Sequence, residues 1–163
     1  MDELHISSQP LRSGLSRLID LIPEGADPWW GIGSTALLLA GVPDVIPQDI
    51  DLLSSRRTVT AMLRRAGATM PERRPGVLFR SYPFARIPAP QALPVEVMAD
   101  LGVFSGARWR SIQPKTRQSI SISGLGVVYI PDAAEQIEIR LLMGRPKDVG
   151  KIAALQKLIA IEG

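Results

Sequence analysis

The sequence predicts an α/β (α+β) protein in which a mixed β-sheet is backed by helices. Leucine and isoleucine recur at helical spacing over residues 11–22. Residues 49–53 and 93–98 read as short apolar strands, and residues 119–130 alternate serine with isoleucine before two valines, which is typical of an antiparallel hairpin. Helices and strands thus alternate early in the chain, and a run of strands precedes the last helices. This order favours the predicted class.

The expected elements have recognisable start and stop residues. Helices are expected at residues 10–22, 36–40, 58–65, 132–143 and 146–159. Strands are expected at residues 29–30, 49–53, 77–82, 93–98, 103–104, 109–112, 119–123 and 127–130. A polar loop runs through Pro75, and the loop after residue 82 is long enough for a flap. The inner face of the last helix is expected to carry Ile152, Leu155, Leu158 and Ile159.

Length and composition indicate a single domain over residues 1–163 with a sizeable core. The chain has 45% apolar and 21% charged residues, which suits a globular protein. No apolar run approaches the roughly 18 residues that a membrane span needs. The first ten residues, MDELHISSQP, are acidic and polar and do not resemble a targeting peptide. We therefore expect a cytoplasmic protein with no membrane contact.

Several kinds of chemistry are excluded by residues that the sequence lacks. There is no cysteine, and the single histidine is His5, close to the N-terminus. Disulfides, thiolate nucleophiles, thiolate zinc sites and paired-histidine metal sites are therefore excluded. A catalytic metal would need carboxylate ligands, which favours a hard ion such as Mg²⁺ (or Mn²⁺).

The basic residues are mostly arginine. Arginine supplies 15 of the 19 basic residues, and the formal net charge is +3. The forked guanidinium suits phosphate, so a nucleotide or nucleic-acid partner fits this composition. A genome that prefers arginine codons would produce the same excess, so composition alone does not identify the partner.

The strongest chemical signal is the pair of acids in the strand at residues 49–53. Asp49 and Asp51 are two residues apart and point to the same side of a strand, about 6.6 Å apart at the backbone. Carboxylates about 5 Å apart repel by roughly 3 kcal/mol at an effective dielectric near 20. A divalent cation between them would remove this repulsion.

A third acid is expected from the strand at residues 93–98. Glu96 lies between Val95 and Val97, so on an alternating strand it faces away from both. Asp100 has the same parity but lies beyond the apolar run, which makes Glu96 the better candidate. Three acids can hold two metals roughly 4 Å apart, which aligns the attacking and leaving oxygens in phosphoryl transfer.

A glycine turn precedes the acids and supplies a site for phosphate. Gly31 and Gly33 would let backbone N–H groups approach a polyphosphate, and Ser34 begins a helix whose dipole favours anions. An ordinary helix cap would also explain Ser34.

The segment GIGSTA also satisfies the dinucleotide fingerprint G-x-G-x-x-A, with Asp51 twenty residues after Gly31. Three features disfavour that alternative. The preceding segment ADPWW is a poor buried strand, and Pro43 and Pro47 cut the helix short. A ribose-binding acid would also end its strand singly, whereas here two acids begin it.

Together these residues resemble the nucleotidyltransferase superfamily of DNA polymerase beta and the aminoglycoside nucleotidyltransferases. The shared pattern is a glycine-serine turn, a spacer, a hydrophobic-flanked Asp-x-Asp and a later hydrophobic-flanked acid. The likeness extends to small bacterial type IV toxin–antitoxin nucleotidyltransferases, which carry a late R-x-K-D segment matched here by residues 145–148. Ile32 stands where that family often has a second glycine, and Gln48 where a threonine or basic residue is common.

The resemblance implies roles for the candidate residues. Gly31, Gly33 and Ser34 would bind the triphosphate of ATP or another nucleoside triphosphate. The acids Asp49, Asp51 and Glu96 would bind the metals and carry the catalysis. Lys147 would contact phosphate or acceptor, although a helix start explains its neighbours equally well.

The acceptor is open at this stage. RNA such as tRNA, a small molecule and a protein side chain are all compatible with the pattern. No large helical domain follows the acids, so a second copy or a partner subunit could complete the cleft. A non-catalytic nucleotide-binding or regulatory partner with the same fold is the alternative function. Arg80 on its predicted strand could face the site or only solvent.

Overall fold

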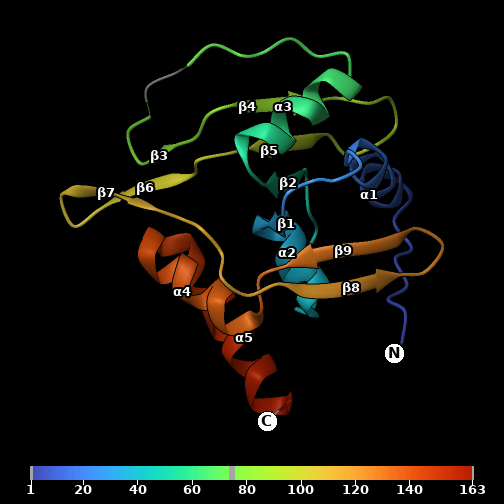
Figure 1. Ribbon diagram of the computed structural model, residues 1–163. Helices are drawn as coiled ribbons and strands as arrows, with labels where there is room; N and C mark the ends of the chain where they lie inside the picture. Colours follow the sequence, from blue (N-terminus) through green and yellow to red (C-terminus); the bar gives the residue numbers. More distant parts are fainter. Residues whose placement is uncertain (1, 74–75, 163) are drawn as a thin grey trace.

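The computed structural model describes residues 2–73 and 76–162, with a four-stranded sheet at its centre (Figure 1). The helices in these residues are α1 (Gln9–Leu21), α2 (Gly33–Ala40), α3 (Arg56–Arg65), α4 (Ala133–Met143) and α5 (Val149–Glu162), with a 3-10 turn at Pro146–Asp148. The strands are β1 (Trp30–Ile32), β2 (Ile50–Leu53), β3 (Phe79–Arg80), β4 (Phe84–Ile87), β5 (Val95–Met98), β6 (Gly102–Ser105), β7 (Arg108–Ser111), β8 (Gln118–Ile122) and β9 (Gly126–Ile130). The predicted α/β class, with a mixed sheet, an added hairpin and two C-terminal helices, is confirmed.

The central sheet has the strand order β1-β2-β5-β4. The inner strands β2 and β5 are parallel, whereas β1 and β4 each run antiparallel to their neighbour. The register aligns Ile32, Asp51, Glu96 and Arg86 in one row across the sheet. Side chains in such a row point to the same face. Strand pairing therefore brings two of the predicted acids and one arginine together.

The direction of β1 also decides between the two interpretations of the glycine turn. A dinucleotide-binding unit requires a parallel crossover from the strand before the turn to the next strand. Here Trp30 pairs with Leu53 and Ile32 pairs with Asp51, so β1 and β2 are antiparallel. The dinucleotide-binding alternative is therefore wrong for this fold.

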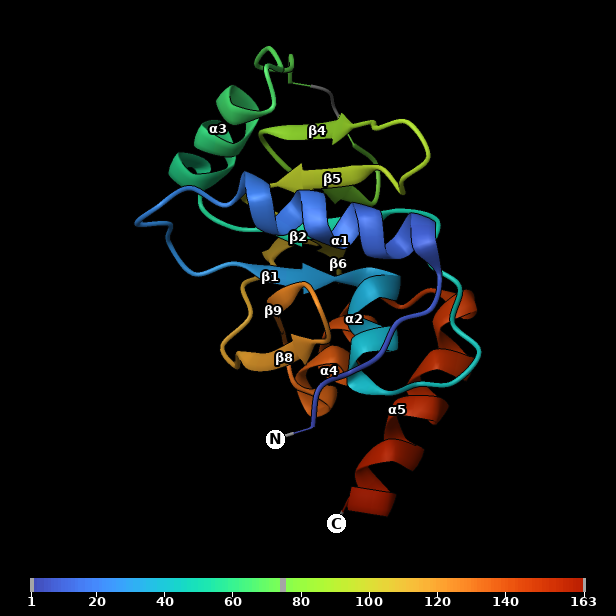
Figure 2. The same cartoon turned by 90° about the vertical axis from the view of Figure 1, so that its right-hand side faces the viewer.

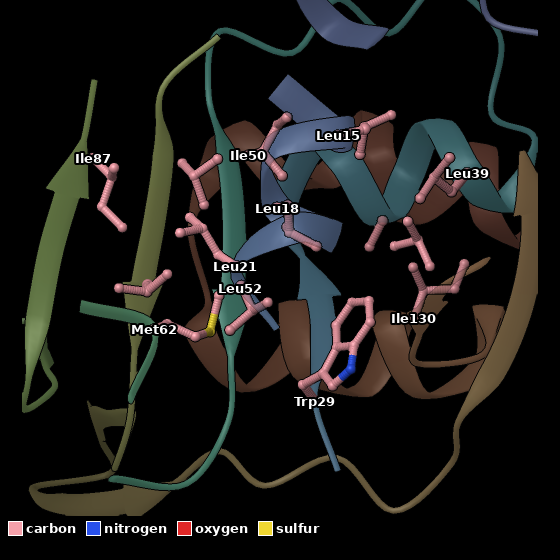
Figure 3. Close-up of a cluster of buried hydrophobic side chains, with 14 of the residues drawn as sticks. Leu15, Leu18, Leu21, Trp29, Leu39, Ile50, Leu52, Met62, Ile87 and Ile130 are labelled. Carbon is pink, nitrogen blue, oxygen red and sulfur yellow. The ribbon is translucent and has the colours of Figure 1, made fainter. Parts of the chain in front are cut away.

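The main core lies between α1 and one face of the central sheet (Figures 2 and 3). Leu15 and Leu18 of α1 and Ile50 of β2 are completely buried. Gly14 permits close packing, because a Cβ atom there would lie 2.6 Å from Ile50 Cδ1 and 2.9 Å from the Leu93 carbonyl oxygen. The alternation of β2 turns Asp51 away from this core and toward the opposite face.

A smaller core covers the opposite face. The small sheet β3-β6-β7 and helix α4 pack there, and Figure 2 shows β6 on the far side of the central sheet from α1. Its buried members are Leu53, Met98, Leu101, Val103 and Ile112. The predicted hairpin is present as β8–β9 and packs beside β1. The acids thus lie on a face bounded by α4 and the small sheet.

The region between residues 77 and 98 differs from the prediction. The strand expected at 77–82 shortens to β3, and part of the expected flap forms β4, which pairs with β5. Pro83 and Pro88 bracket β4 and give its sequence the composition of a loop. Burial of Ile87 against the core provides the reason for the pairing. The predicted loop residue Pro75 lies outside the described residues.

Two helix predictions also need correction. α2 begins at Gly33 and not at residue 36, because Gly33 and Ser34 form its first turn. The last helix buries Leu155 completely but leaves Ile159 exposed, since its C-terminal end extends away from the body of the molecule (Figure 1). In the part of the chain that the structure describes, no helix has the length and apolar character of a membrane span.

Candidate active site

Three carboxylates converge on the face of the sheet that α1 does not cover. Asp49 precedes β2, Asp51 lies within it, and Glu96 lies beside Asp51 on β5. Each contributes one oxygen to a group in which all three atoms lie within 4.8 Å of one another. The predicted convergence of these acids is thus present. Asp100, the alternative third acid, instead pairs with Arg56 at 2.6 Å.

Arg86 of β4 is the arginine nearest to this carboxylate cluster. Its Nη1 lies 3.7 Å from Glu96 Oε1 and 3.9 Å from Asp49 Oδ2. The Arg86 side chain is 56% exposed, so water weakens its compensation of the three acids. Sequence reasoning missed Arg86 because its segment read as a loop. The available signal was the alternation of Arg86 with the buried Ile87.

Burial and mutual repulsion raise the pKa values of two of the acids. Burial first, and then the charge on Asp49, raises the pKa of Asp51 to about 6. Burial and the neighbouring carboxylates of Asp49 and Asp51 raise the pKa of Glu96 to about 7. Without additional positive charge, ionising all three acids is costly at this separation. A cation bound among the three oxygens would offset this cost at neutral pH.

The glycine turn lies directly against Asp51. Gly33 has φ +65°, and a Cβ atom there would lie 2.8 Å from Asp51 Oδ2. Glycine is therefore required at this position by both backbone conformation and space. Ser34 is half-buried in the first turn of α2, where unpaired N–H groups favour anions. Gly31 lies two residues before Gly33, inside β1 and opposite Leu52.

A cavity of about 280 Å³ opens beside Gly33 and Asp51. Its walls are mainly apolar and include Ile32, Phe79, Phe84, Met98, Ile139 and Met143. Gln136 of α4 also lines it and is buried. The Gln136 amide nitrogen donates to the carbonyl oxygens of Ala36 and Pro131, whereas its Oε1 has no partner among the described residues.

The predicted R-x-K-D segment forms a buried ion cluster next to this cavity. Asp148 is completely buried and accepts hydrogen bonds at 2.7 Å from both Arg140 Nη1 and Arg145 Nε. Arg140 also donates from Nη2 to the Gly33 carbonyl oxygen at 3.3 Å. Arg140 and Arg145 both line the cavity. Lys147 is exposed and does not line the cavity, so its phosphate-binding role stays a prediction.

Other arginines and a tryptophan that could have contributed to the site lie away from the acids. Arg57 pairs with Asp27 at 2.7 Å. Arg80 is exposed and stacks over Trp109, with its guanidinium carbon 4.3 Å from the ring centroid. Trp29 is buried in the main core, in agreement with a structural role for that residue.

Comparison with solved structures identifies the fold. A "putative nucleotidyltransferase" of known crystal structure from Thermotoga maritima superimposes with a TM-score of 0.64, covering 91% of this chain and 89% of that chain. This chain has a nucleotidyltransferase-like fold. The two sequences are 20% identical, so the likeness establishes the fold, while residue roles depend on the site itself. No protein-family model matches the chain, and no curated protein matches it.

The donor atoms of the carboxylate cluster fit a hard divalent cation. All three ligands are carboxylate oxygens, the type that Mg²⁺ and Mn²⁺ prefer. Asp49, Asp51 and Glu96 could therefore hold such an ion, with the Asp51 carboxylate lying directly against Gly33.

Proposed function

We propose that this protein is a metal-dependent nucleotidyltransferase. The convergence of Asp49, Asp51 and Glu96 beside the glycine turn carries the proposal. The nucleotidyltransferase-like fold supports it. The protein would move a nucleoside monophosphate from a nucleoside triphosphate to an acceptor hydroxyl and release pyrophosphate.

The donor nucleotide is assigned to the turn and the neighbouring cavity. Backbone N–H groups at the start of α2, with Ser34, suit the triphosphate. Arg140 and Arg145 add positive charge to the same wall. The mainly apolar cavity suits the flat face of a nucleobase, and the unpartnered Gln136 Oε1 suits an amino group on that base.

The proposed reaction forms one bond and breaks one bond. The acceptor oxygen attacks the α-phosphorus, the bond from that phosphorus to the bridging oxygen breaks, and the electron pair leaves with pyrophosphate. Glu96 accepts the hydroxyl proton of the acceptor. A bound Mg²⁺ or Mn²⁺ supplies charge neutralisation at the attacking and leaving oxygens. Asp49 and Asp51 would hold it, and the absence of a side chain at Gly33 lets the Asp51 carboxylate lie against the turn that would bind the triphosphate.

A non-catalytic nucleotide-binding or regulatory protein is the second candidate function. Arg86 favours it in one respect, because this cation already lies against two of the three acids. The two candidates differ in their response to metal. An enzyme of the proposed type requires Mg²⁺ for transfer, whereas a non-catalytic protein transfers nothing with or without it.

The test supplies Mg²⁺ and each of ATP, GTP, CTP and UTP, labelled at either the α- or the γ-phosphate. RNA, proteins and small hydroxyl compounds serve as acceptors. The proposal expects transfer of the α-label alone, loss of transfer in Asp51→Asn, and full transfer in Asp20→Asn. Asp20 is an exposed acid on α1, so its substitution matches the chemical change away from the site. Transfer of the γ-label, or α-label transfer that survives Asp51→Asn, would contradict the proposal.

A further inference from the structure

An arginine-rich groove lies beside the small sheet. We call it the arginine groove; it has a volume of about 780 Å³ and is lined by Arg56, Arg73, Arg80, Tyr82, Trp109 and Arg110, together with Asp100. Its four arginines and one acid carry a net charge of three, equal to the formal net charge of the whole chain. Positive charge is therefore concentrated in one groove of a protein whose other charges nearly balance.

Aromatic rings alternate with the guanidinium groups of this groove. Arg80 lies 4.3 Å from the Trp109 ring centroid, and Arg73 lies 4.2 Å from that of Tyr82. Stacking uses the flat face of a guanidinium and leaves the N–H groups at its edge able to bind phosphate. Proteins that bind single-stranded nucleic acid combine positive charge with aromatic rings in this way.

Most of the positive charge in the groove is not neutralised internally. Arg56 pairs with Asp100, and both side chains are more than half exposed. Arg80 and Arg73 form no ion pair within residues 2–73 and 76–162. The arginines at Asp148 are the opposite case, because both form ion pairs with that buried acid. The arginine groove therefore retains charge for an anionic partner.

A second hollow adjoins the arginine groove and reaches Arg86, the arginine beside the carboxylate cluster. Arg80 and Ser81 line both the groove and this hollow, whose lining also includes Phe84 and Arg86. Arg86 Nη1 lies 3.7 Å from Glu96 Oε1. An extended polymer in the groove could therefore direct one end along this path toward Glu96.

We propose that the arginine groove binds single-stranded nucleic acid and presents its terminal hydroxyl to the carboxylate cluster as the acceptor. Phosphates would contact the arginines, while bases would stack against the half-buried rings of Trp109 and Tyr82. The acceptor role rests on the proposed nucleotidyl transfer. Binding itself does not, because it requires neither metal nor donor nucleotide.

The test measures binding by fluorescence anisotropy without metal or nucleoside triphosphate. A short single-stranded RNA, DNA of the same sequence and polyglutamate are compared over a range of salt concentrations. Each neutralised phosphate contributes about −0.7 to the slope of log K against log salt for single strands. The proposal expects Arg80→Ala to reduce this slope by about that amount. Lys157→Ala removes an exposed charge on α5, outside the groove, and should leave the slope unchanged.

Loss of an aromatic ring provides a different signature. Trp109→Ala should weaken binding by about tenfold, because stacking on one base is lost, yet leave the salt slope unchanged. Circular dichroism and melting curves of each variant exclude misfolding as the cause. Tight binding of both RNA and DNA supports a groove that contacts the sugar-phosphate backbone of the nucleic acid. A preference for RNA identifies a contact to the 2′-hydroxyl.

Three results would overturn the inference. They are undetectable binding of both nucleic acids, binding that Arg80→Glu does not weaken more than Lys157→Glu does, and equal binding of polyglutamate, which indicates an acidic protein partner. Failure of the proposed function is recognised separately. In that case nucleic acid still binds through Arg80, but no labelled nucleotide is transferred to it.

Discussion

Two clusters of charge border the same cavity and are built in opposite ways. Asp148 is completely buried but is hydrogen-bonded by Arg140 and Arg145, which lower its pKa despite the opposing effect of burial. In the carboxylate cluster, burial and repulsion between acids raise the pKa of Asp51 to about 6. The chemical group is the same, and its partners determine the sign of the shift.

The difference indicates separate roles for the two clusters. The Asp148 cluster is complete in itself and joins α4, the start of α5 and the Gly33 turn through Arg140. The carboxylate cluster has only the exposed Arg86 beside it among the described residues. We therefore expect changes at Asp148 to affect folding, and changes at Asp51 to affect metal binding and catalysis.

The largest expected effect is on transfer activity. Asp51→Asn should lower the rate of nucleotidyl transfer by about 10³-fold, because the site loses a ligand that holds the neutralising metal. Its melting temperature should not fall, since the substitution removes a repelling charge. Rates and melting curves measured on the same preparation check both parts. A destabilised and fully active variant would reverse the assignment of the two clusters.

The next effect is on stability. Asp148→Leu should lower the free energy of unfolding by about 3 kcal/mol, because it leaves the buried Arg140 without its counter-charge. Denaturant titration measures the loss. Asp20→Leu is the control, because Asp20 is exposed. Asp132→Leu is unsuitable, because Asp132 caps α4 and its loss would itself destabilise the protein. Equal stability of the Asp148 and Asp20 variants would show that the ion cluster contributes little.

The two clusters should also respond to pH in opposite directions. Asp148 has a lowered pKa, so its contribution is present above its unfolded pKa and is lost as pH falls through the folded pKa. Asp51 and Glu96 have raised pKa values, so their contribution is present below the unfolded values of 3.8 and 4.5 and is lost as pH rises through about 6 and 7.

Metal-free protein should therefore lose stability between about pH 4 and pH 7. The loss attributable to Asp51 should be on the order of 1–2 kcal/mol after allowance for solvent screening. Saturating Mg²⁺ should remove most of this loss, and so should Asp51→Asn. Melting curves across this range, with and without Mg²⁺, measure the effect. Stability that rises steadily through pH 7 without metal would contradict the assignment.

The smallest expected effect is at Arg86. Arg86→Gln should tighten Mn²⁺ binding by about two- to fivefold, since one competing exposed cation is removed. Titration followed by electron paramagnetic resonance measures the affinity. Arg64→Gln, an exposed arginine on α3, supplies the control. Weaker Mn²⁺ binding in the Arg86 variant would mean that this residue organises the acids.

The acids and the turn were predictable because their signals are local. Alternation within residues 49–53 determines that Asp49 and Asp51 share a face, and the flanking valines determine the direction of Glu96. The parallel pairing of β2 with β5 was not needed to choose these residues, although it is what brings them together. The position of Gly33 against Asp51, in contrast, follows from the antiparallel pairing of β1 with β2, which places Ile32 opposite Asp51.

The rest of the site depends on contacts between distant parts of the chain. Arg86 reaches the acids only because β4 pairs with β5, and two prolines hide that strand in the sequence. Arg140 contacts the Gly33 carbonyl across 107 residues. Asp148 looked like part of a phosphate-binding motif, since no local pattern reveals that Arg140 from the preceding helix neutralises it. Strand pairing and the burial of ion pairs, rather than local composition, determine where these three side chains lie.

The most direct test of the central claim is a crystal structure with Mn²⁺ and a non-hydrolysable nucleoside triphosphate, analysed by the anomalous scattering of manganese. We predict an anomalous peak bound by carboxylate oxygens of Asp49, Asp51 and Glu96, with the triphosphate at the Gly33–Ser34 turn. A complex in which the nucleotide is bound but no manganese contacts these three acids would contradict the account.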